Sequence, residues 1–238
     1  MLRKNNKTVL ATANIKFSQG DFKGSLKLYE EYVNKTKEKD LIYLSVLQNI
    51  GVCNKKLSNI DIALEYYRQA LDLSRNLNSK EEEASALSNV AVILKNQGAE
   101  MFKAGKIKES YEKFSEAEEL FDQATEIDLE TENYNGVASD LLNLGNLYKT
   151  RLENSKAIAA FNRCIVYSKK TNNLRTIGSA ICGIGNIHLL VGEYDEAIEK
   201  YQAALEILVA SSQYDTQWLT NLTQENIRKA KELKRGNN

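Results

Sequence analysis

The residue types that could carry out chemistry are few in this chain, and they stand far apart. His188 is the only histidine, and Cys53, Cys164 and Cys182 show no CxxC spacing. A His-based zinc site or a Ser-His-Asp triad needs more partners than these. We therefore expect His188 to be a packed or groove residue and the cysteines to act as small hydrophobic side chains.

Two short motifs also invite a functional interpretation. Gly183-Ile184-Gly185 lacks the third glycine and the preceding strand of a dinucleotide fingerprint. Glu81-Glu82-Glu83 stands where a helix is expected to begin, so its simplest role is to complement the helix dipole. No catalytic group of residues emerges, and the sequence predicts a protein that is not an enzyme and has no cofactor or metal.

The composition narrows the class of partner. The 238 residues include 32 basic and 32 acidic side chains, and no proline. Zero net charge argues against nucleic acid or a membrane surface as partner. No apolar run is long enough for a signal peptide or a membrane span, and the odd cysteine number favours no disulfide framework. We expect a cytoplasmic protein made of long helices.

Four segments of the chain align with one another. Each carries apolar residues around one tiny residue, which is Gly51, Ala91, Gly145 or Gly185. The segments are LQNIGVCNK (47–55), LSNVAVILK (87–95), LLNLGNLYK (141–149) and ICGIGNIHL (181–189). Twelve residues after three of the tiny residues comes an alanine, with an aromatic residue at plus four and a small residue at plus seven. These triplets are Ala63-Tyr67-Ala70, Ala157-Phe161-Cys164 and Ala197-Tyr201-Ala204. Small and aromatic residues at this spacing share one helix face, which predicts repeated helix-turn-helix hairpins.

The spacing between repeats is constant except in one hairpin. Gly51 to Ala91 and Gly145 to Gly185 are each 40 residues, whereas Ala91 to Gly145 is 54. The extra fourteen residues divide into one heptad per arm, which lengthens both helices without rotating their buried face. Between them the second-helix pattern occurs twice, at Ser110-Phe114-Ala117 and Ala117-Phe121-Ala124.

The organisation that follows is a single all-α domain over residues 1–238, a right-handed solenoid of hairpins. We expect repeats at about 7–38, 41–77, 81–131 (the elongated hairpin), 135–171 and 175–211. The first is a degenerate copy around Ala13. A capping helix at 215–235 should cover the last apolar face with Trp218, Leu219 and Leu222.

This pattern resembles the tetratricopeptide repeat over nearly the whole chain. The fourth repeat carries it most closely, through Leu144, Gly145, Tyr148, Ala157 and Phe161. The family period is 34, and we expect the six extra residues between the second helix of one repeat and the first of the next. The longer period is similar to the Leu-Gly-Asn subgroup and to kinesin light chain. The family's proline between repeats is missing.

The resemblance implies a concave groove that binds an extended peptide or a partner helix. The expected groove residues occupy equivalent places around the tiny residues: Asn14, Asn49, Lys55, Asn89, Lys95, Asn143, Asn146, Lys149 and Asn186. Asparagine can bond a peptide backbone, and lysine favours an acidic partner. The alternative is that the asparagines follow the family consensus and the lysines are solvated surface. A chaperone-tail clamp is disfavoured because Leu10, Ser85 and Asn89 replace its three cations.

The tip of the long hairpin carries Met101, Phe102, Ile107 and Tyr111. Either these side chains pack on each other and close the hairpin, or they dock a partner. The leading function is thus a protein-interaction module. The alternatives are a scaffold subunit held by its ends and the long hairpin, and a regulatory subunit of an enzyme or motor. The sequence predicts neither the partner's identity nor the oligomeric state.

Overall fold

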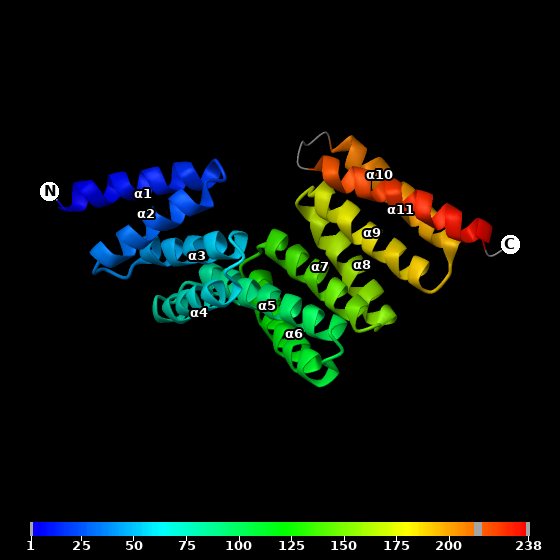
Figure 1. Ribbon diagram of the computed structural model, residues 1–238, viewed down its shortest axis with the longest axis horizontal. Coiled ribbons are helices and arrows are strands. Elements are labelled where there is room, and N and C mark those ends of the chain that lie inside the picture. The colour runs from blue at the N-terminus through cyan, green and yellow to red at the C-terminus, as the bar shows by residue number, and fades with distance from the viewer. Residues whose placement is uncertain (1, 212–215, 237–238) are drawn as a thin grey trace. The chain divides into compact units, whose positions relative to one another are not determined.

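The computed structural model describes residues 2–211 and 216–236, which form eleven α-helices and no strand (Figure 1). The all-α expectation is therefore confirmed. The helices are α1 (Leu2–Ser18), α2 (Phe22–Lys35), α3 (Leu41–Lys56), α4 (Ile60–Asn76), α5 (Lys80–Lys103), α6 (Ile107–Glu130), α7 (Tyr134–Thr150), α8 (Asn154–Lys170), α9 (Leu174–Leu190), α10 (Tyr194–Ala210) and α11 (Gln217–Gly236).

The chain forms two compact units, an N-terminal unit of residues 1–123 and a C-terminal unit of residues 124–238, and the division falls inside α6. Within each unit, helices that follow one another in the chain pack side by side. The expectation of one domain for the whole chain stays a prediction.

Eight of the connections between helices are turns of the same design. Each has three residues, and the central one has a positive φ. The central residues are Gly20, Ser58, Asn78, Gly105, Glu132, Leu152, Asn172 and Gly192. In each turn the third residue donates its N–H to a carbonyl five residues back, as Glu153 does to Tyr148 at 2.9 Å. This is the Schellman arrangement, which satisfies the carbonyls at a helix end.

The turn design disfavours proline at two positions of each of these eight turns. Proline has φ fixed near −65° and no N–H, so it cannot occupy the second position, which needs positive φ, or the third, which must donate a hydrogen bond. The turns thus replace the proline that the family places between repeats.

The expected position of the six extra residues is wrong. Only residues 171–173 separate α8 from α9, the same length as the turn 151–153 inside the hairpin. The period of 40 consists of helices of 17 residues, as in α7, α8, α9 and α10, joined by these three-residue turns. The repeat is longer because its helices are longer.

The long hairpin is built by α5 and α6, which have 24 residues each, against 17 in α4 and α7. Both arms are therefore extended by one heptad, which the spacing of 54 between Ala91 and Gly145 predicted. A heptad of α-helix adds roughly 10 Å to each arm.

The core of each hairpin is a close contact between a tiny residue and an aromatic ring sixteen residues later. A Cβ added to Gly51 would lie 2.6 Å from Tyr67, and one added to Gly145 would lie 2.5 Å from Phe161. Distances this short leave no room for a methyl group, so these positions require glycine. In the long hairpin the same contact is made by Gly98 on Phe114, at 2.9 Å. Sequence reasoning missed Gly98, although its spacing of twelve to Ser110 was a usable signal.

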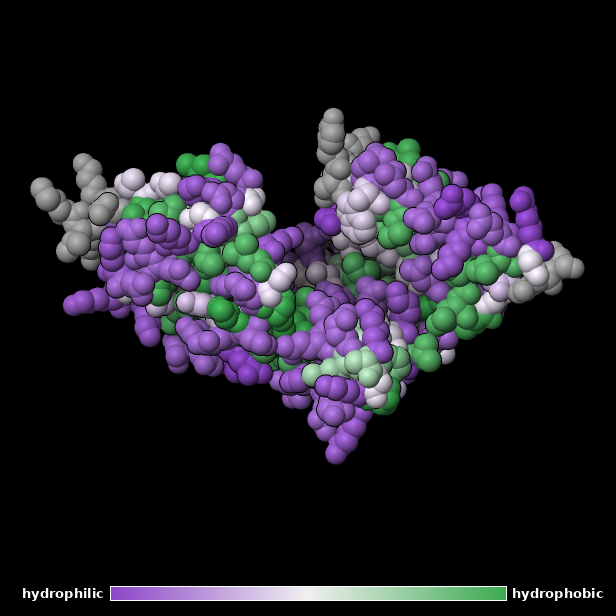
Figure 2. Space-filling model, viewed as in Figure 1, coloured by the Kyte–Doolittle hydropathy of each residue, from purple (hydrophilic) through white to green (hydrophobic). Residues whose placement is uncertain are grey.

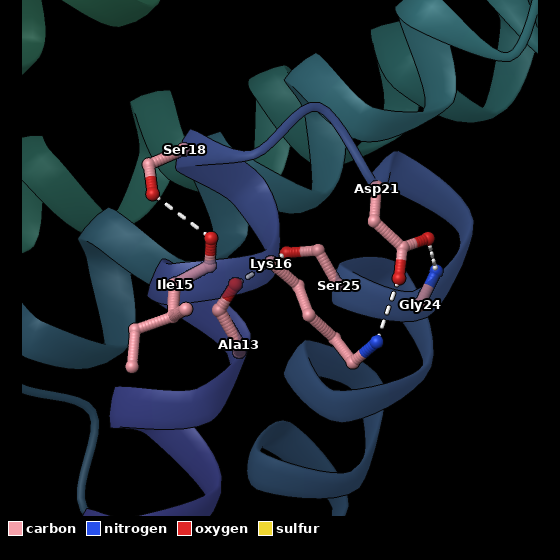
Figure 3. A network of polar contacts seen from close by, with 7 residues as sticks. All are labelled: Ala13, Ile15, Lys16, Ser18, Asp21, Gly24 and Ser25. Atoms are coloured by element: carbon pink, nitrogen blue, oxygen red, sulfur yellow. Dashed lines mark hydrogen bonds and ion pairs between the residues drawn. The ribbon is translucent and has the colours of Figure 1, made fainter.

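A serine fixes the register of two hairpins. The Ser25 hydroxyl donates to the Ala13 carbonyl at 2.9 Å (Figure 3), and Ser110 donates to the Gly98 carbonyl at the same distance. Both serines are fully buried. Figure 3 also shows Asp21, which accepts from the Gly24 N–H and from Lys16. These bonds fasten the two helices of the hairpin at the turn.

The last helix, α11, covers the end of the C-terminal unit only in part. Leu219 is 5% exposed, but Trp218 and Leu222 are 56% and 44% exposed. The prediction that all three cover the last apolar face is therefore wrong for Trp218 and Leu222. Residue 215, where the helix was expected to begin, lies outside the described residues.

Candidate binding surfaces

The residues that could suggest an enzyme, His188 and the three cysteines, are paired or buried in the folded chain. His188 Nδ1 lies 2.6 Å from Glu193 Oε2, across the turn between α9 and α10. All three cysteines are free and buried, and burial raises the pKa of the Cys164 thiol to about 11. A thiol with a raised pKa is a poor nucleophile at neutral pH. Among the described residues, no group of three His, Cys, Asp or Glu side chains could hold a metal ion.

The remaining two motifs also have packing roles. Gly183 and Gly185 face the rings of Phe161 and Tyr201, where a Cβ would lie 2.5 and 2.8 Å away. Glu83 of the acidic run lies in the first turn of α5 and pairs with Arg75 at 2.9 Å.

In the N-terminal unit, two predicted groove residues meet at one hydroxyl group. Tyr29 donates to Asn14 Oδ1 at 2.7 Å, and Asn49 Nδ2 donates to the Tyr29 hydroxyl at 3.3 Å. Asn49 belongs to the next hairpin, so this relay joins two repeats. Asn89 and Lys95 are half-buried on α5.

In the C-terminal unit the pattern recurs with one change. The Tyr201 hydroxyl donates to Asn186 Oδ1 at 2.7 Å, as Tyr29 does to Asn14. The equivalent ring one repeat earlier is Phe161, which has no hydroxyl. There Asn146 donates to the Leu142 carbonyl at 3.0 Å and accepts from Lys149 Nζ at 3.2 Å. Asn143 donates to the Ser139 carbonyl of its own helix.

Asn146 and Asn186 line one pocket of about 330 Å³ between α7, α9 and α11. Arg175 is the only charged side chain of its described lining. The exposed Trp218 and Leu222 line it too. Sequence reasoning missed Arg175 and took Trp218 for a covering residue, because only the docking of α11 shows which of its sides meets α9.

The pocket has unused hydrogen-bonding capacity. Asn186 Oδ1 accepts from Tyr201, and within the described part of the chain its Nδ2 has no acceptor. Lys149 lies beside Asn146 but does not line the pocket, and burial lowers the pKa of its ammonium group.

Lys55 lies elsewhere, in the N-terminal unit, together with Met101 of the predicted docking tip. Both line a pocket of about 620 Å³ between α3, α4, α5 and α6. Lys55 Nζ is 5.7 Å from the centre of the Tyr67 ring. The Tyr67 hydroxyl is buried and has no hydrogen-bond partner.

The other tip residues differ in exposure. Phe102 is half-buried, whereas Ile107 and Tyr111 are 48% and 37% exposed. Tyr111 makes an edge contact with the Phe114 ring at 6.3 Å between centroids. Whether the tip docks a partner stays a prediction.

No helix in the described ranges is long and apolar enough to cross a bilayer.

Comparison with known families gives two matches. The family model described as soluble NSF attachment protein matches residues 94–218, more than half of the chain. The tetratricopeptide repeat model matches residues 44–77. A curated relative, the photosystem I assembly protein Ycf3 of Rippkaea orientalis (strain PCC 8801 / RF-1), is 31% identical over 118 residues. That match covers 49% of this chain and 62% of the relative, which is less than two thirds of its length.

Solved structures share the fold at low identity. BtubC (BKLC) from P. vanneervenii has a TM-score of 0.68 at 20% identity, over 87% of this chain and 81% of its own. Aspartyl phosphate phosphatase F from Bacillus subtilis has a TM-score of 0.73 at 14% identity. The match covers 96% of this chain and 59% of the phosphatase chain. A putative kinesin light chain from Podospora anserina has a TM-score of 0.63 at 14% identity. The match covers 86% of this chain and 95% of the kinesin light chain structure. The similarity to tetratricopeptide and kinesin light chain repeats is therefore confirmed for the fold.

Proposed function

Since the chain belongs to the soluble NSF attachment protein family and has a tetratricopeptide-type fold, we propose that it is a non-enzymatic adaptor. Its C-terminal unit binds an extended, acidic segment of a partner protein in the pocket between α7, α9 and α11. The fold itself is of the protein-interaction type, and the matched relative is an assembly protein by name. We place the adaptor in the cytoplasm.

The observation that carries the proposal is the orientation of the Asn186 amide. Tyr201 holds Oδ1 at 2.7 Å, which leaves Nδ2 for an incoming acceptor at the pocket. A peptide carbonyl supplies such an acceptor, and binding through the backbone does not depend on the bound sequence.

Charge and apolar surface complete the site. Arg175 is the only ionic side chain of the described lining, so a carboxylate fits there better than a cation. Trp218 is 56% exposed, and Leu222 is 44% exposed. Exposed tryptophan with arginine nearby is typical of the residues that dominate binding energy at interfaces.

The test uses a display library of random 12-residue peptides selected on the full chain. Peptides that carry Asp or Glu should be enriched. Their affinity, measured by fluorescence anisotropy, should fall roughly tenfold or more in Arg175→Glu and in Asn186→Ala. Arg163→Glu is the matched control, because Arg163 is exposed on α8 and does not line the pocket.

If the enriched peptides bind Arg175→Glu as tightly as the parent chain, the pocket is not their site and the proposal fails. Lys149→Glu tests the original groove prediction separately. If Lys149→Glu loses the enriched peptides while Arg175→Glu binds them with the parent affinity, the binding site lies closer to Lys149.

A further inference from the structure

The long hairpin of α5 and α6 extends past the turn of the shorter hairpin of α3 and α4. We call the place where the longer arms pass this turn the step. The turn of that shorter hairpin is centred on Ser58, whereas α5 continues to Lys103 and α6 begins at Ile107. Ala91 corresponds to Gly51 by the repeat spacing, so the chain beyond Gly98 extends past the neighbouring turn. The pocket of about 620 Å³ lies at this step.

The walls of the pocket are two helical stripes. On α4 the lining residues Ile60, Leu64 and Arg68 recur every four positions. On α5, Ile93, Gln97 and Met101 recur in the same way. Side chains four apart form the ridges between which a further helix packs. Figure 2 shows hydrophobic groups gathered over α4 and α5 among hydrophilic ones.

Most charges of the pocket are already accounted for. Arg68 and Lys113 share Glu116 at 3.4 and 3.6 Å. Glu100 pairs with Lys103 at 2.8 Å. Asp61 is exposed in the first turn of α4, where it complements the positive end of the helix dipole.

Lys55 is the exception. Its side chain is half-buried, its recorded contact is the Tyr67 ring, and no carboxylate among the described residues pairs with it. Burial lowers the pKa of this ammonium group, with a smaller contribution from Lys56. A half-buried cation without a carboxylate partner costs stability, which an incoming carboxylate would offset.

We propose that the step is a second docking site, which takes a helix of a partner protein. That helix presents one large apolar side chain between the two stripes and an Asp or Glu one turn away against Lys55. Residues three or four apart on a helix share a face, so both groups reach the pocket together. The site lies in the N-terminal unit and does not depend on the pocket of the C-terminal unit.

The experiment selects a display library built on a monomeric helical scaffold, randomised at four positions of one face. Selection uses the full chain carrying Arg175→Glu, so that the first pocket does not dominate. Enriched helices should pair a Leu, Met or Phe with an Asp or Glu three or four residues away. Their affinity should fall roughly tenfold or more in Lys55→Glu and in Met101→Asp.

Two further variants keep the result interpretable. Lys108→Glu changes an exposed lysine near the tip that does not line the pocket, and it should leave affinity unchanged. Lys55→Met removes the charge without adding an opposite one, and should weaken binding while the chain stays folded. Helices that bind Lys55→Glu and Met101→Asp as tightly as the parent, or an enriched set without acidic residues, overturn the proposal. Neither result bears on the peptide pocket at Arg175.

Discussion

The tyrosines at the centres of the hairpins differ in what their hydroxyl groups meet. The residue after the tiny position is Asn14 in the first hairpin and Asn186 in the fifth, and both accept from a tyrosine. In the second hairpin that position holds Val52, and the Tyr67 hydroxyl is buried without a partner. A buried hydroxyl without a hydrogen bond costs free energy, and a bonded one does not.

This difference predicts opposite outcomes for the same substitution. Tyr201→Phe should lower the free energy of unfolding by about 1 kcal/mol, because it removes the bond to Asn186. Tyr67→Phe should leave it unchanged or raise it by up to about 1 kcal/mol, because it removes a hydroxyl without a partner. Urea unfolding followed by circular dichroism measures both. Equal losses in the two variants would contradict the structural difference.

Lys55 gives a second prediction, for stability against pH. Its pKa is lowered in the folded chain, so between that pKa and the usual lysine value the unfolded chain binds more protons. Stability therefore rises with pH through this window. Lys55→Met should unfold at a higher temperature than the parent at pH 7, and the difference should shrink as the pH rises toward the usual lysine pKa.

Thermal unfolding at several pH values checks the Lys55 prediction. Lys56→Met is the control, because Lys56 is exposed on the same turn of α3. A parent chain that is more stable than Lys55→Met at pH 7 would mean that the ammonium group is compensated. If Lys55→Met is more stable than the parent and binds the selected helices more weakly, Lys55 is a residue kept for function at a cost in stability.

At the scale of elements, the three-residue turns decide where the helices end. Their central residue has a left-handed conformation, which glycine adopts freely and asparagine tolerates. Leu152 holds this position with φ 62° while its side chain is 60% exposed. Leu152 therefore has a strained backbone conformation, and its side chain is too exposed to offset that strain by hydrophobic burial.

Leu152→Gly should therefore stabilise the chain. The left-handed conformation costs an L-residue roughly 1–2 kcal/mol, and the added freedom of glycine in the unfolded chain offsets about half of that. We expect a gain of up to about 1 kcal/mol, or roughly 2–4 °C in the unfolding midpoint. Asn172→Gly is the matched control in an equivalent turn and should change the midpoint less. A lower midpoint for Leu152→Gly would show that its side chain makes contacts worth more than the strain.

At the scale of the whole molecule, the heptad in each arm of the long hairpin can be removed as a unit. Deleting Ala91–Gln97 and Tyr111–Ala117 restores the spacing of the other hairpins. Gly98 then takes the place of Ala91, seven residues before Gly105, and Ser110 is followed by Phe121 and Ala124 at plus four and plus seven. Because a heptad rotates a helix face by only about 20°, the shortened chain should fold with a similar helical fraction.

Binding separates the two proposed surfaces in this variant. The shortened chain should lose the selected helices, since the step is gone, and keep the peptides that depend on Arg175. A deletion of Val92–Asn96 alone is the control, because five residues rotate the following face by about 140° and should prevent folding. Retention of the helices by the shortened chain would place their site away from the step.

The sequence by itself determined the hairpins, their register and the longer arms of α5 and α6. These features are periodic, because a tiny residue stands sixteen positions before an aromatic ring in each hairpin. Tertiary structure alone decided which side chains meet across helices. It brought Lys55 to Met101, placed Arg175 beside Asn146 and Asn186, and left Tyr67 without a partner. Such pairs depend on how neighbouring helices approach, and no spacing within one helix encodes that approach.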